Sequence, residues 1–423
     1  MKYDRFNFAN SNLNKVGHAI NNAYHYLKSL GFIVKNKKRV KRKIEDGKIL
    51  NVVFVIQYIS AWNKLEPIYS KMKMNDRFNP TIVCVPLNIQ NNILVNNKND
   101  TYEYFVNNGY EVINSINSDN SWFDIKKLEP DYLFHSRPYN HFMPKCYTSS
   151  EIVKYSLICN VLYGLNLTKN VEPVLLNRDY FKDCFCYYAL DKNEKRFYEK
   201  RFFLGIKFKI QKCFDYGGIG IEQMLMARPK EKQSNFKKTI IWTPRWSTDK
   251  KIGGSNFFNY KDLILKLAEE YNECLFIIRP HPLMFSNFIS TGELSKTDVE
   301  KFKNYCENKS NIILDETKEY YETFWQSDIL ISDGSAVVPE YFATGKPILF
   351  CQSNLSETNT AFYNDIISRC YEVYNEYDLV NCFKRVLFDN DEMENIRKEF
   401  IDNILNNYKD NSNKIINSLL NWK

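Results

Sequence analysis

The sequence predicts an α/β protein made of two doubly wound, Rossmann-like domains that face a central cleft. Short apolar runs of the kind found in buried parallel strands alternate with helix-capable stretches in both halves of the chain. A chain of 423 residues is too long for one ordinary hydrophobic core, and two domains of about 170–200 residues each are expected. A hydrophobic content of 44% is enough to fill both cores.

The first predicted domain covers residues 49–215, and a basic helical segment, residues 1–48, precedes it. Residues 186–215 are aromatic and charged and are expected to be helical. The domain's strands are expected at Leu50–Gln57, Thr81–Val85, Glu111–Ile113 and Tyr132–Phe134.

The second predicted domain covers residues 216–390, and C-terminal helices over 391–423 are expected to pack back across the first. Gly217-Gly218-Ile219-Gly220 is expected to be an interdomain hinge. Its Gly-Gly-x-Gly pattern is too short and badly placed to be a dinucleotide fingerprint.

The most informative stretch of the second domain is a strand, a polar turn and a short helix. Ile329–Ile331 is a short apolar run, and the helix is expected to start at about Ala336. Free backbone N–H groups at such a helix start suit a phosphate or diphosphate. The turn between strand and helix consists of Ser332, Asp333, Gly334 and Ser335.

Two other predicted strands end in basic, proline-containing turns. One ends in Arg279-Pro280-His281-Pro282, where two prolines hold the backbone rigid around the histidine. The other ends in Thr243-Pro244-Arg245-Trp246. Arginine offers a planar donor fork for phosphate oxygens, and ligands of open α/β sheets bind at the carboxyl ends of strands. We therefore expect the three turns to converge on one anionic ligand.

These three turns, in this order, resemble the CDP-glycerol glycerophosphotransferase family, the teichoic-acid and capsule polymerases of GT-B architecture. The clear resemblance covers residues 237–352, and a weaker one reaches back to about residue 130. It implies a GT-B-like fold with an acceptor-side first domain and a nucleotide-donor second domain. It also implies diphosphate binding by His281, Ser335 and Arg245. The full set expected at the diphosphate is Thr243, Arg245, Arg279, His281, Ser332, Asp333, Gly334, Ser335 and Ala336, with Glu340 at the ribose.

The chain departs from the family at the expected catalytic base. Family members carry a Trp-His-Gly segment, and the counterpart here reads Leu162-Tyr163-Gly164. His135 and His141, just after a predicted strand, are therefore the candidate bases, with Tyr163 as an outside candidate. His281 is a further candidate catalytic residue, since histidine can act as an acid or base near neutral pH.

The N-terminal segment combines an apolar helical face between Leu13 and Val34 with a dense basic run. One interpretation is contact with an anionic membrane surface, at about 1 kcal/mol per basic charge. The other is a solvated tether. Nucleic-acid binding is disfavoured, since no recognised nucleic-acid module is present. The basic run is Lys35, Lys37, Lys38, Arg39, Lys41, Arg42 and Lys43.

Composition favours a cytoplasmic protein, located peripherally on the inner face of the plasma membrane if the basic run binds lipid. The eleven cysteines are scattered without a C-x-x-C pair, which is typical of a reduced protein. No apolar run is long enough to span a bilayer, and a signal-peptide core is absent. No protein-bound metal and no obligatory cofactor are expected, although a divalent cation is compatible with a diphosphate ligand.

The resemblance implies a transferase that moves glycerol phosphate, or a related polyol phosphate, from a CDP-activated donor. CDP-glycerol or another nucleotide-diphosphate donor would be the substrate, and a cell-surface glycan or lipid-linked acceptor of capsule, teichoic-acid or lipopolysaccharide synthesis would receive the group. One alternative is a GT-B glycosyltransferase that uses a nucleotide sugar. A second is a non-catalytic assembly subunit, for which the missing histidine is the main support.

Overall fold

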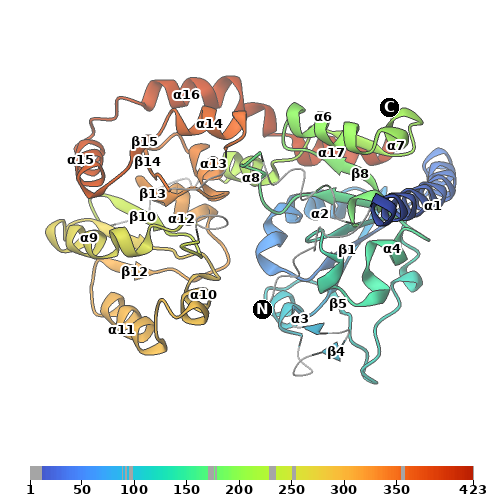
Figure 1. Ribbon diagram of the computed structural model, residues 1–423, viewed down its shortest axis with the longest axis horizontal. Coiled ribbons are helices and arrows are strands. Elements are labelled where there is room, and N and C mark those ends of the chain that lie inside the picture. The colour runs from blue at the N-terminus through green and yellow to red at the C-terminus, as the bar shows by residue number, and fades with distance from the viewer. Residues whose placement is uncertain are drawn as a thin grey trace. The chain divides into compact units, whose positions relative to one another are not determined.

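The computed structural model consists of two units, each built around a parallel β-sheet with helices on its faces (Figure 1). It describes residues 12–87, 89–90, 93–94, 99–169, 176, 179–227, 235–249, 254–353 and 358–422. The first unit comprises Met1–Tyr58, Tyr69–Val161 and Leu176–Asp215. The second comprises Ile59–Ile68, Leu162–Leu175 and Tyr216–Lys423, so two short segments from the first half of the chain belong to it.

The first unit has a seven-stranded sheet in the order β5-β2-β1-β6-β7-β8-β9, and its neighbouring strands all pair in parallel over the described residues. Its inner strands are buried along almost their whole length because helices cover both faces. The strands are β1 (Leu50–Ile56), β2 (Phe78–Cys84), β5 (Val112–Asn114), β6 (Tyr132–His135), β7 (Leu157–Val161), β8 (Cys184–Tyr188) and β9 (Lys212–Phe214). A small antiparallel pair, β3 (Ile89–Gln90) and β4 (Ile93–Leu94), lies outside this sheet.

The expectation that residues 186–215 are helical is only partly correct. Helices α6 (Lys192–Arg201) and α7 (Phe203–Lys207) occupy the middle of this stretch, but strands β8 and β9 occupy its two ends. Cys184–Tyr188 is fully buried, and its aromatic residues suit a pleated surface covered on both sides. Without a period of two, such a strand resembles a buried helix in the sequence.

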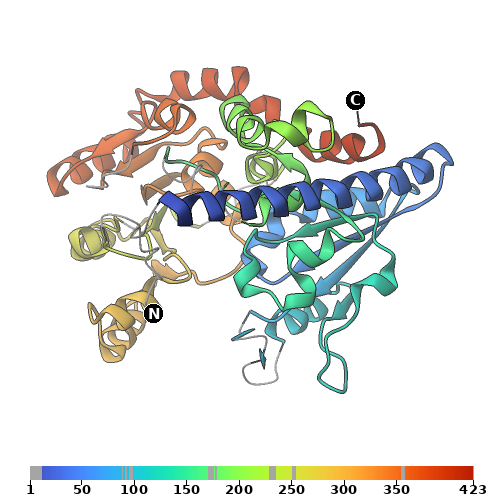
Figure 2. The same ribbon diagram turned by 45° about the vertical axis from the view of Figure 1, so that its right-hand side comes forward.

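Helix α1 (Asn12–Glu45) is one long helix that contains the basic run as well as the apolar face (Figure 2). Leu30, Ile33 and Val40 on this helix are buried in the first unit. Besides α6 and α7, the α-helices described in the first half of the chain include α2 (Glu66–Lys73), α3 (Asp100–Asn107) and α4 (Ser149–Ile152). Within the described ranges, no helix is long and apolar enough to cross a membrane.

The second unit has a six-stranded parallel sheet in the order β12-β11-β10-β13-β14-β15. Its strands are β10 (Thr239–Thr243), β11 (Leu275–Ile278), β12 (Ile312–Leu314), β13 (Ile329–Asp333), β14 (Ile348–Cys351) and β15 (Tyr371–Val373). Its helices are α8 (Ile219–Met226), α9 (Phe257–Glu270), α10 (Met284–Thr291), α11 (Lys296–Glu307), α12 (Tyr321–Gln326), α13 (Val337–Phe342), α14 (Ala361–Ile367), α15 (Glu376–Leu387), α16 (Glu394–Asn403) and α17 (Asn411–Leu420).

The four strands predicted at the start of the first domain and the three predicted at the polar turns of the second all exist. A continuous core joins β10, β11, β13 and β14 to the helices on one face of the second sheet. Two parallel-sheet α/β units are the predicted fold class, which is therefore confirmed.

The glycine-rich segment at the start of the second unit caps a helix. Gly218 has a φ of 69° and is the N-cap of α8, a left-handed conformation that glycine adopts without strain. Gly220 lies inside α8, where an added Cβ atom would overlap a Glu340 carboxylate oxygen. These two glycines therefore have separate local roles, one in the backbone conformation and one in close packing.

Candidate functional site

Three strand ends of the second unit lie at one edge of its sheet. Strands β11, β10 and β13 are neighbours and run parallel, so the turns that follow them share the carboxyl edge. The His281 amide donates to the Pro244 carbonyl at 3.1 Å, which joins the turns after β11 and β10. The Arg245 amide donates to Asp333 Oδ2 at 2.8 Å, which joins the turns after β10 and β13. The three turns are therefore held together by hydrogen bonds.

Asp333 is the centre of this framework. It is 1% exposed and accepts hydrogen bonds from the backbone of Arg245 and from both the amide (3.2 Å) and Nδ2 (2.9 Å) of Asn256. Burial raises the pKa of Asp333, and these donors act in the opposite direction. Its oxygens are directed at the protein, so the predicted direct contact of Asp333 with a diphosphate is not supported. It positions the turns instead.

The hydroxyls of Thr243 and Ser332 also make their hydrogen bonds inside the protein, so they are not directed at a ligand. The Thr243 hydroxyl donates to Ser332 Oγ at 2.7 Å, and the Ser332 hydroxyl donates to the Asp333 carbonyl at 2.7 Å. Both residues are buried, and they are directly paired in the β10–β13 register. They connect the ends of the two strands.

Arg279 has an internal partner as well. Its guanidinium donates to the Asp315 carboxylate and, through Nη2, to the Thr317 carbonyl at 2.7 Å. It also lies over the Tyr320 ring, 5.3 Å from the ring centre. A phosphate would have to displace Asp315 to reach this guanidinium, so the structure does not support the predicted phosphate contact of Arg279.

His281 is placed to donate a hydrogen bond. Burial and the nearby Arg245 charge lower its pKa to about 4, so the ring is neutral near pH 7. Its Nδ1 accepts from the Leu283 amide at 3.2 Å. The proton of the neutral ring therefore sits on Nε2, which is available as a donor to an anion.

The turn after β13 leaves a buried hydroxyl without a partner. Ser335 Oγ makes no hydrogen bond among the described residues, although it is shielded from solvent. Gly334 and Ala336 are partly exposed and bring backbone to the same edge. Helix α13 begins only at Val337 and has six residues. The side chains and amides of the turn are thus a better basis for anion binding than the helix itself.

A tyrosine that no sequence motif marks lies against this turn. Tyr363 of α14 is 3% exposed, and its hydroxyl would be 3.5 Å from a Cβ atom placed on Gly334. Arg245 is near enough to act on the pKa values of both Tyr363 and His281. No local motif marks Tyr363, because it lies on α14, which follows the next strand, β14, in the chain.

Glu340, the predicted ribose residue, is buried in an ion pair. Its carboxylate lies 2.6 Å from Lys64 Nζ and also accepts a hydrogen bond from the Tyr320 hydroxyl. Lys64 Nζ also donates to the hydroxyls of Tyr320 and Tyr321, both at 2.8 Å. Glu340 is 1% exposed, so the expected contact with a ribose is not supported. No local sequence pattern marks Lys64, because its partner Glu340 lies 276 residues away.

The predicted base His135 is buried in the first unit. It is 1% exposed, its Nε2 donates to the Tyr147 carbonyl at 2.9 Å, and its Nδ1 accepts from the Tyr180 hydroxyl at 3.1 Å. Burial lowers its pKa to about 4. The expectation that it is accessible as a base is wrong, because both ring nitrogens are engaged inside the protein.

The two other candidate bases are more accessible. His141 lies in a short 3-10 helix, Asn140–Phe142, and its exposed ring packs on Phe142 with a 4.0 Å centroid distance. Tyr163 is partly exposed and belongs to the second unit.

The basic run of α1 divides into two sets. Arg39 and Lys43 both pair with Asp131, which is completely buried, and the Lys37 ammonium donates to the Lys209 carbonyl. These three serve the fold, contrary to the prediction of a membrane contact for the whole run. The residues that remain exposed are Lys35, Lys38, Lys41 and Arg42.

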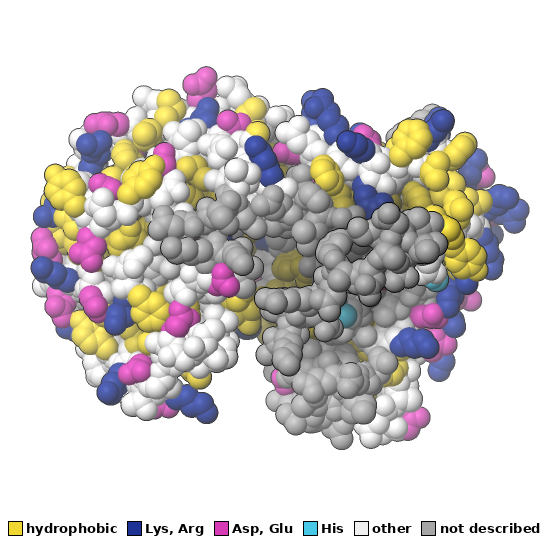
Figure 3. All heavy atoms as spheres, in the orientation of Figure 1, with side chains coloured by type: hydrophobic (Ala, Val, Ile, Leu, Met, Phe, Trp, Pro, Cys, Tyr) yellow, Lys and Arg dark blue, Asp and Glu magenta, His cyan; other side chains and the backbone are white. Residues whose placement is uncertain are grey.

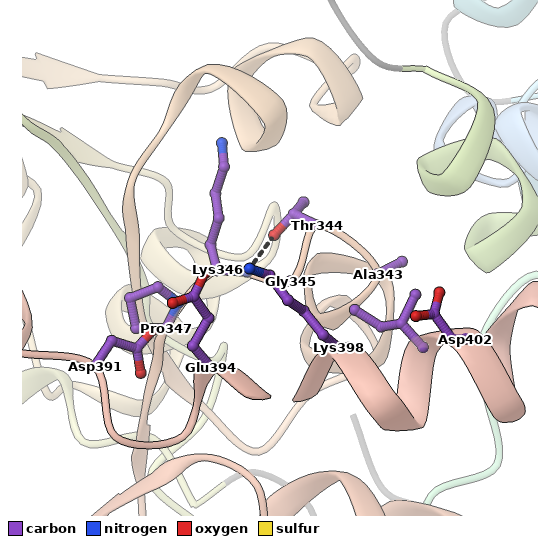
Figure 4. Close-up of a pocket in the computed structure, with 10 residues that line it drawn as sticks. Ala343, Thr344, Gly345, Lys346, Pro347, Asp391, Glu394, Lys398 and Asp402 are labelled. Atoms are coloured by element: carbon purple, nitrogen blue, oxygen red, sulfur yellow. Dashed lines mark hydrogen bonds and ion pairs between the residues drawn. The ribbon is translucent and has the colours of Figure 1, made fainter. Parts of the chain in front are cut away.

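A cavity of about 430 Å³ lies at the opposite edge of the second sheet. Gly345, Lys346 and Pro347, which precede β14, form one side, and α16 forms the other (Figure 4). Its charged groups have partners: Glu394 pairs with Lys398, and Lys346 Nζ donates to the Ser327 carbonyl. Among the residues described, no group of three or more His, Cys, Asp or Glu could hold a metal.

Comparison with known proteins gives one family match. Residues 227–421 match the model of the CDP-glycerol:poly(glycerophosphate) glycerophosphotransferases. This segment contains all three strand-end turns. No curated protein sequence matches the chain.

Solved structures of similar fold cover nearly the whole chain. A UDP co-structure of S. aureus MnaA has 15% identity, covers 88% of this chain and 97% of its own, and gives a TM-score of 0.58. A putative UDP-N-acetylglucosamine 2-epimerase from Listeria monocytogenes has 12% identity, coverages of 89% and 98%, and a TM-score of 0.59. The wall teichoic acid polymerase TagF, soaked with CDPG, has 14% identity, coverages of 95% and 97%, and a TM-score of 0.51. These likenesses support the GT-B-like fold.

Proposed function

Residues 227–421 match the CDP-glycerol:poly(glycerophosphate) glycerophosphotransferase family, as the strand-end motifs predict, and on this premise we propose that the protein is a glycerophosphotransferase. It transfers glycerol phosphate from CDP-glycerol to a hydroxyl of a glycan acceptor. The observation that carries the proposal is the joining of the Arg245, His281 and Ser335 turns at one sheet edge inside the matched segment.

In the proposed reaction the acceptor oxygen attacks the β-phosphorus of CDP-glycerol. A new oxygen–phosphorus bond forms, the bond to the CMP oxygen breaks, and the acceptor proton passes to a base. Such a reaction is accelerated mainly by positioning and by charge stabilisation. The Arg245 guanidinium, His281 Nε2–H and the Gly334 amide supply positive charge and donors for the phosphate oxygens.

We assign the base to His141, because burial removes His135 from consideration whereas the ring of His141 is exposed. Replacing His141 by Gln should lower kcat by at least about 100-fold, the usual contribution of a general base. CDP binding should not change. Tyr163→Phe is the companion variant, and a large kcat loss there with none in the His141 variant would move the assignment to Tyr163.

The acceptor side includes a surface suited to anionic lipid. Three large apolar side chains of α1 and three at or beside α7 are exposed, and the two helices are joined by Tyr26, whose hydroxyl accepts from the Gly205 amide at 3.0 Å. Figure 3 shows hydrophobic side chains gathered on the right-hand side of the view, where α1 and α7 lie, with Lys and Arg side chains around them. We call these six residues the apolar patch: Ile20, Tyr24, Leu27, Phe203, Leu204 and Phe208.

Apolar side chains and exposed lysines together favour a location at the cytoplasmic face of a membrane. Vesicles of anionic lipid should bind the wild-type protein, and Leu27→Ser with Phe208→Ser should reduce that binding at least about tenfold. Vesicles of neutral lipid are the control. Equal binding of wild type and variant to anionic vesicles would exclude the patch.

The function is tested by incubation of the protein with CDP-glycerol and a glycerol-phosphate-primed glycan. Release of CMP with a new phosphodiester supports the proposal, whereas a nucleotide product with a new glycosidic bond identifies a glycosyltransferase. Absence of turnover with any donor favours an assembly subunit.

His281→Ala and Arg245→Met should each lower kcat/KM by at least about 100-fold. Arg385→Met, which removes the same charge from an exposed ion pair with Glu392, is the matched control and should retain activity.

A divalent cation is proposed only as a companion of the diphosphate. The described residues offer no cluster of metal ligands, so such an ion would be held chiefly by phosphate oxygens. If this is correct, EDTA should weaken CDP-glycerol binding without changing the melting temperature of the free protein.

A further inference from the structure

Two buried hydroxyls at the turn after β13 lack hydrogen-bond acceptors. The Tyr363 hydroxyl and Ser335 Oγ are both shielded from solvent, and neither donates to an acceptor within the described ranges. Tyr363 is 3% exposed, so solvent does not replace the missing partner. A buried hydroxyl without an acceptor is unfavourable and calls for an explanation, such as a ligand.

The position of the two hydroxyls indicates what kind of acceptor is missing. The Tyr363 hydroxyl lies beside Gly334, 3.5 Å from the position of a Cβ atom there. The Arg245 guanidinium contributes positive charge at Tyr363 and at His281. An acceptor that enters among hydroxyl donors and a guanidinium is favoured if it is an anion.

The turn provides a route to these donors. Gly334 and Ser335 are partly exposed, although the hydroxyl oxygens are covered. Without a side chain, Gly334 leaves open the space between the turn and the rings of Phe350 and Tyr363, which a Cβ atom would contact at 3.4 and 3.5 Å.

We propose that Tyr363 is a binding residue for the donor diphosphate, and that its hydroxyl and Ser335 Oγ donate together to a phosphate oxygen. This inference rests on the proposed function, because it takes the diphosphate of the donor as the ligand. It adds a fourth chain segment, α14 beyond β14, to the three strand-end turns that the sequence indicates.

The test is calorimetric binding of CDP, with CMP and UDP alongside it, to the full chain. Tyr363→Phe keeps the ring, which packs edge-on against Phe350 at a 6.0 Å centroid distance, and removes only the hydroxyl. The Kd for CDP should rise about tenfold or more, as expected for a lost hydrogen bond to a charged group. The melting temperature should change little, because the hydroxyl has no acceptor for its own proton and its removal costs only the contact with the Ser335 backbone amide.

Tyr371→Phe is the matched control. The Tyr371 hydroxyl donates to Asp391 Oδ1 at 3.0 Å, so this variant should melt earlier and bind CDP as the wild type does. Gly334→Ala is a second probe, because its new methyl would lie against the Tyr363 hydroxyl without a severe clash. It should weaken CDP binding while the fold stays intact.

The outcomes separate the inference from the function. If wild type and Tyr363→Phe bind CDP equally, the inference is wrong and the proposed function stands. If UDP binds instead of CDP and Tyr363→Phe weakens UDP binding, the inference stands and the proposed donor is wrong. If no nucleotide binds to the wild type, both are overturned.

Discussion

Replacement of Lys64 by Met should destabilise the second unit strongly. The side chains of Lys64 and Glu340 are 6% and 2% exposed, and Lys64 Nζ lies 2.6 Å from the Glu340 carboxylate. Methionine fills a similar volume but leaves that carboxylate buried without its cation. Removal of one partner from a buried ion pair costs about 3–5 kcal/mol of unfolding free energy, because the remaining charge cannot be solvated.

The double variant tests whether the cost comes from the unpaired charge. Glu340→Gln alone should also cost several kcal/mol, since Lys64 then loses its counter-ion. The double variant Lys64→Met with Glu340→Gln removes both charges, and its loss should be smaller than the sum of the two single losses by about 2–3 kcal/mol. The Tyr320 hydroxyl can still donate to the carboxamide oxygen of the introduced glutamine, which keeps one hydrogen bond.

Urea unfolding followed by tryptophan fluorescence suits this measurement. Trp62, Trp242, Trp246, Trp325 and Trp422 lie in the second unit and only Trp122 in the first, so the signal reports mainly on the second unit. Single losses below about 1 kcal/mol, or a double loss equal to the sum, would refute the reasoning.

The pH dependence of the pair has a defined sign. Burial alone would lower the pKa of Lys64, but Glu340 and Tyr320 more than offset it, so its pKa lies above the ordinary 10.5. The stabilisation is therefore complete below about pH 10.5 and is lost as the pH rises through the pKa of the folded state. The coupling energy should be constant between pH 7 and pH 9.

Three further variants test the site framework and the core. His135 has a pKa of about 4 against an ordinary 6.5, so it contributes stability that is present above pH 6.5 and lost as the pH falls to 4. This contribution is about 3 kcal/mol of unfolding free energy. In His135→Gln, the unfolding free energy measured with urea should therefore depend less on pH over that range. Asp333→Asn sets an NH₂ group against the Asn256 amide donors. It should cost about 1–3 kcal/mol of unfolding free energy and weaken CDP binding. Unchanged CDP binding by calorimetry would show that the three turns keep their positions without the Asp333 carboxylate. Gly220→Ala brings a Cβ atom within 2.5 Å of Lys64 Nζ and should cost about 3 kcal/mol or more in the same fluorescence assay, whereas a loss below about 1 kcal/mol would mean that the ion pair can shift aside.

The sequence predicts the position of the strand ends better than the partners of the residues on them. Apolar runs and proline-containing turns place Arg245, His281 and Ser335 at one edge, because parallel neighbours share it. Their chemistry at that edge depends on residues far away in sequence. Asp333 is occupied by Asn256, and Arg279 by Asp315. No local pattern encodes these pairs, so a prediction from the sequence counts every polar side chain on a turn as a ligand.

Two other differences have the same origin. The aromatic strand β8 resembles a helix in the sequence because a strand buried on both faces loses the alternation that identifies it. The basic run of α1 resembles one continuous surface, yet Arg39 and Lys43 neutralise the buried Asp131. In both cases tertiary burial, which is not visible in local composition, decides the outcome.

The return of Ile59–Ile68 to the second unit has a consequence for the order of synthesis. Lys64 leaves the ribosome 276 residues ahead of Glu340, which at about 5–20 residues per second is a delay of roughly 15–55 s. During that interval the nascent chain carries a cation whose burial site does not yet exist. The first sheet can form early, but this loop must stay open until the last third of the chain emerges. The second unit is therefore completed after translation of both halves, and a fragment starting at residue 216 would lack the cation that its buried glutamate requires.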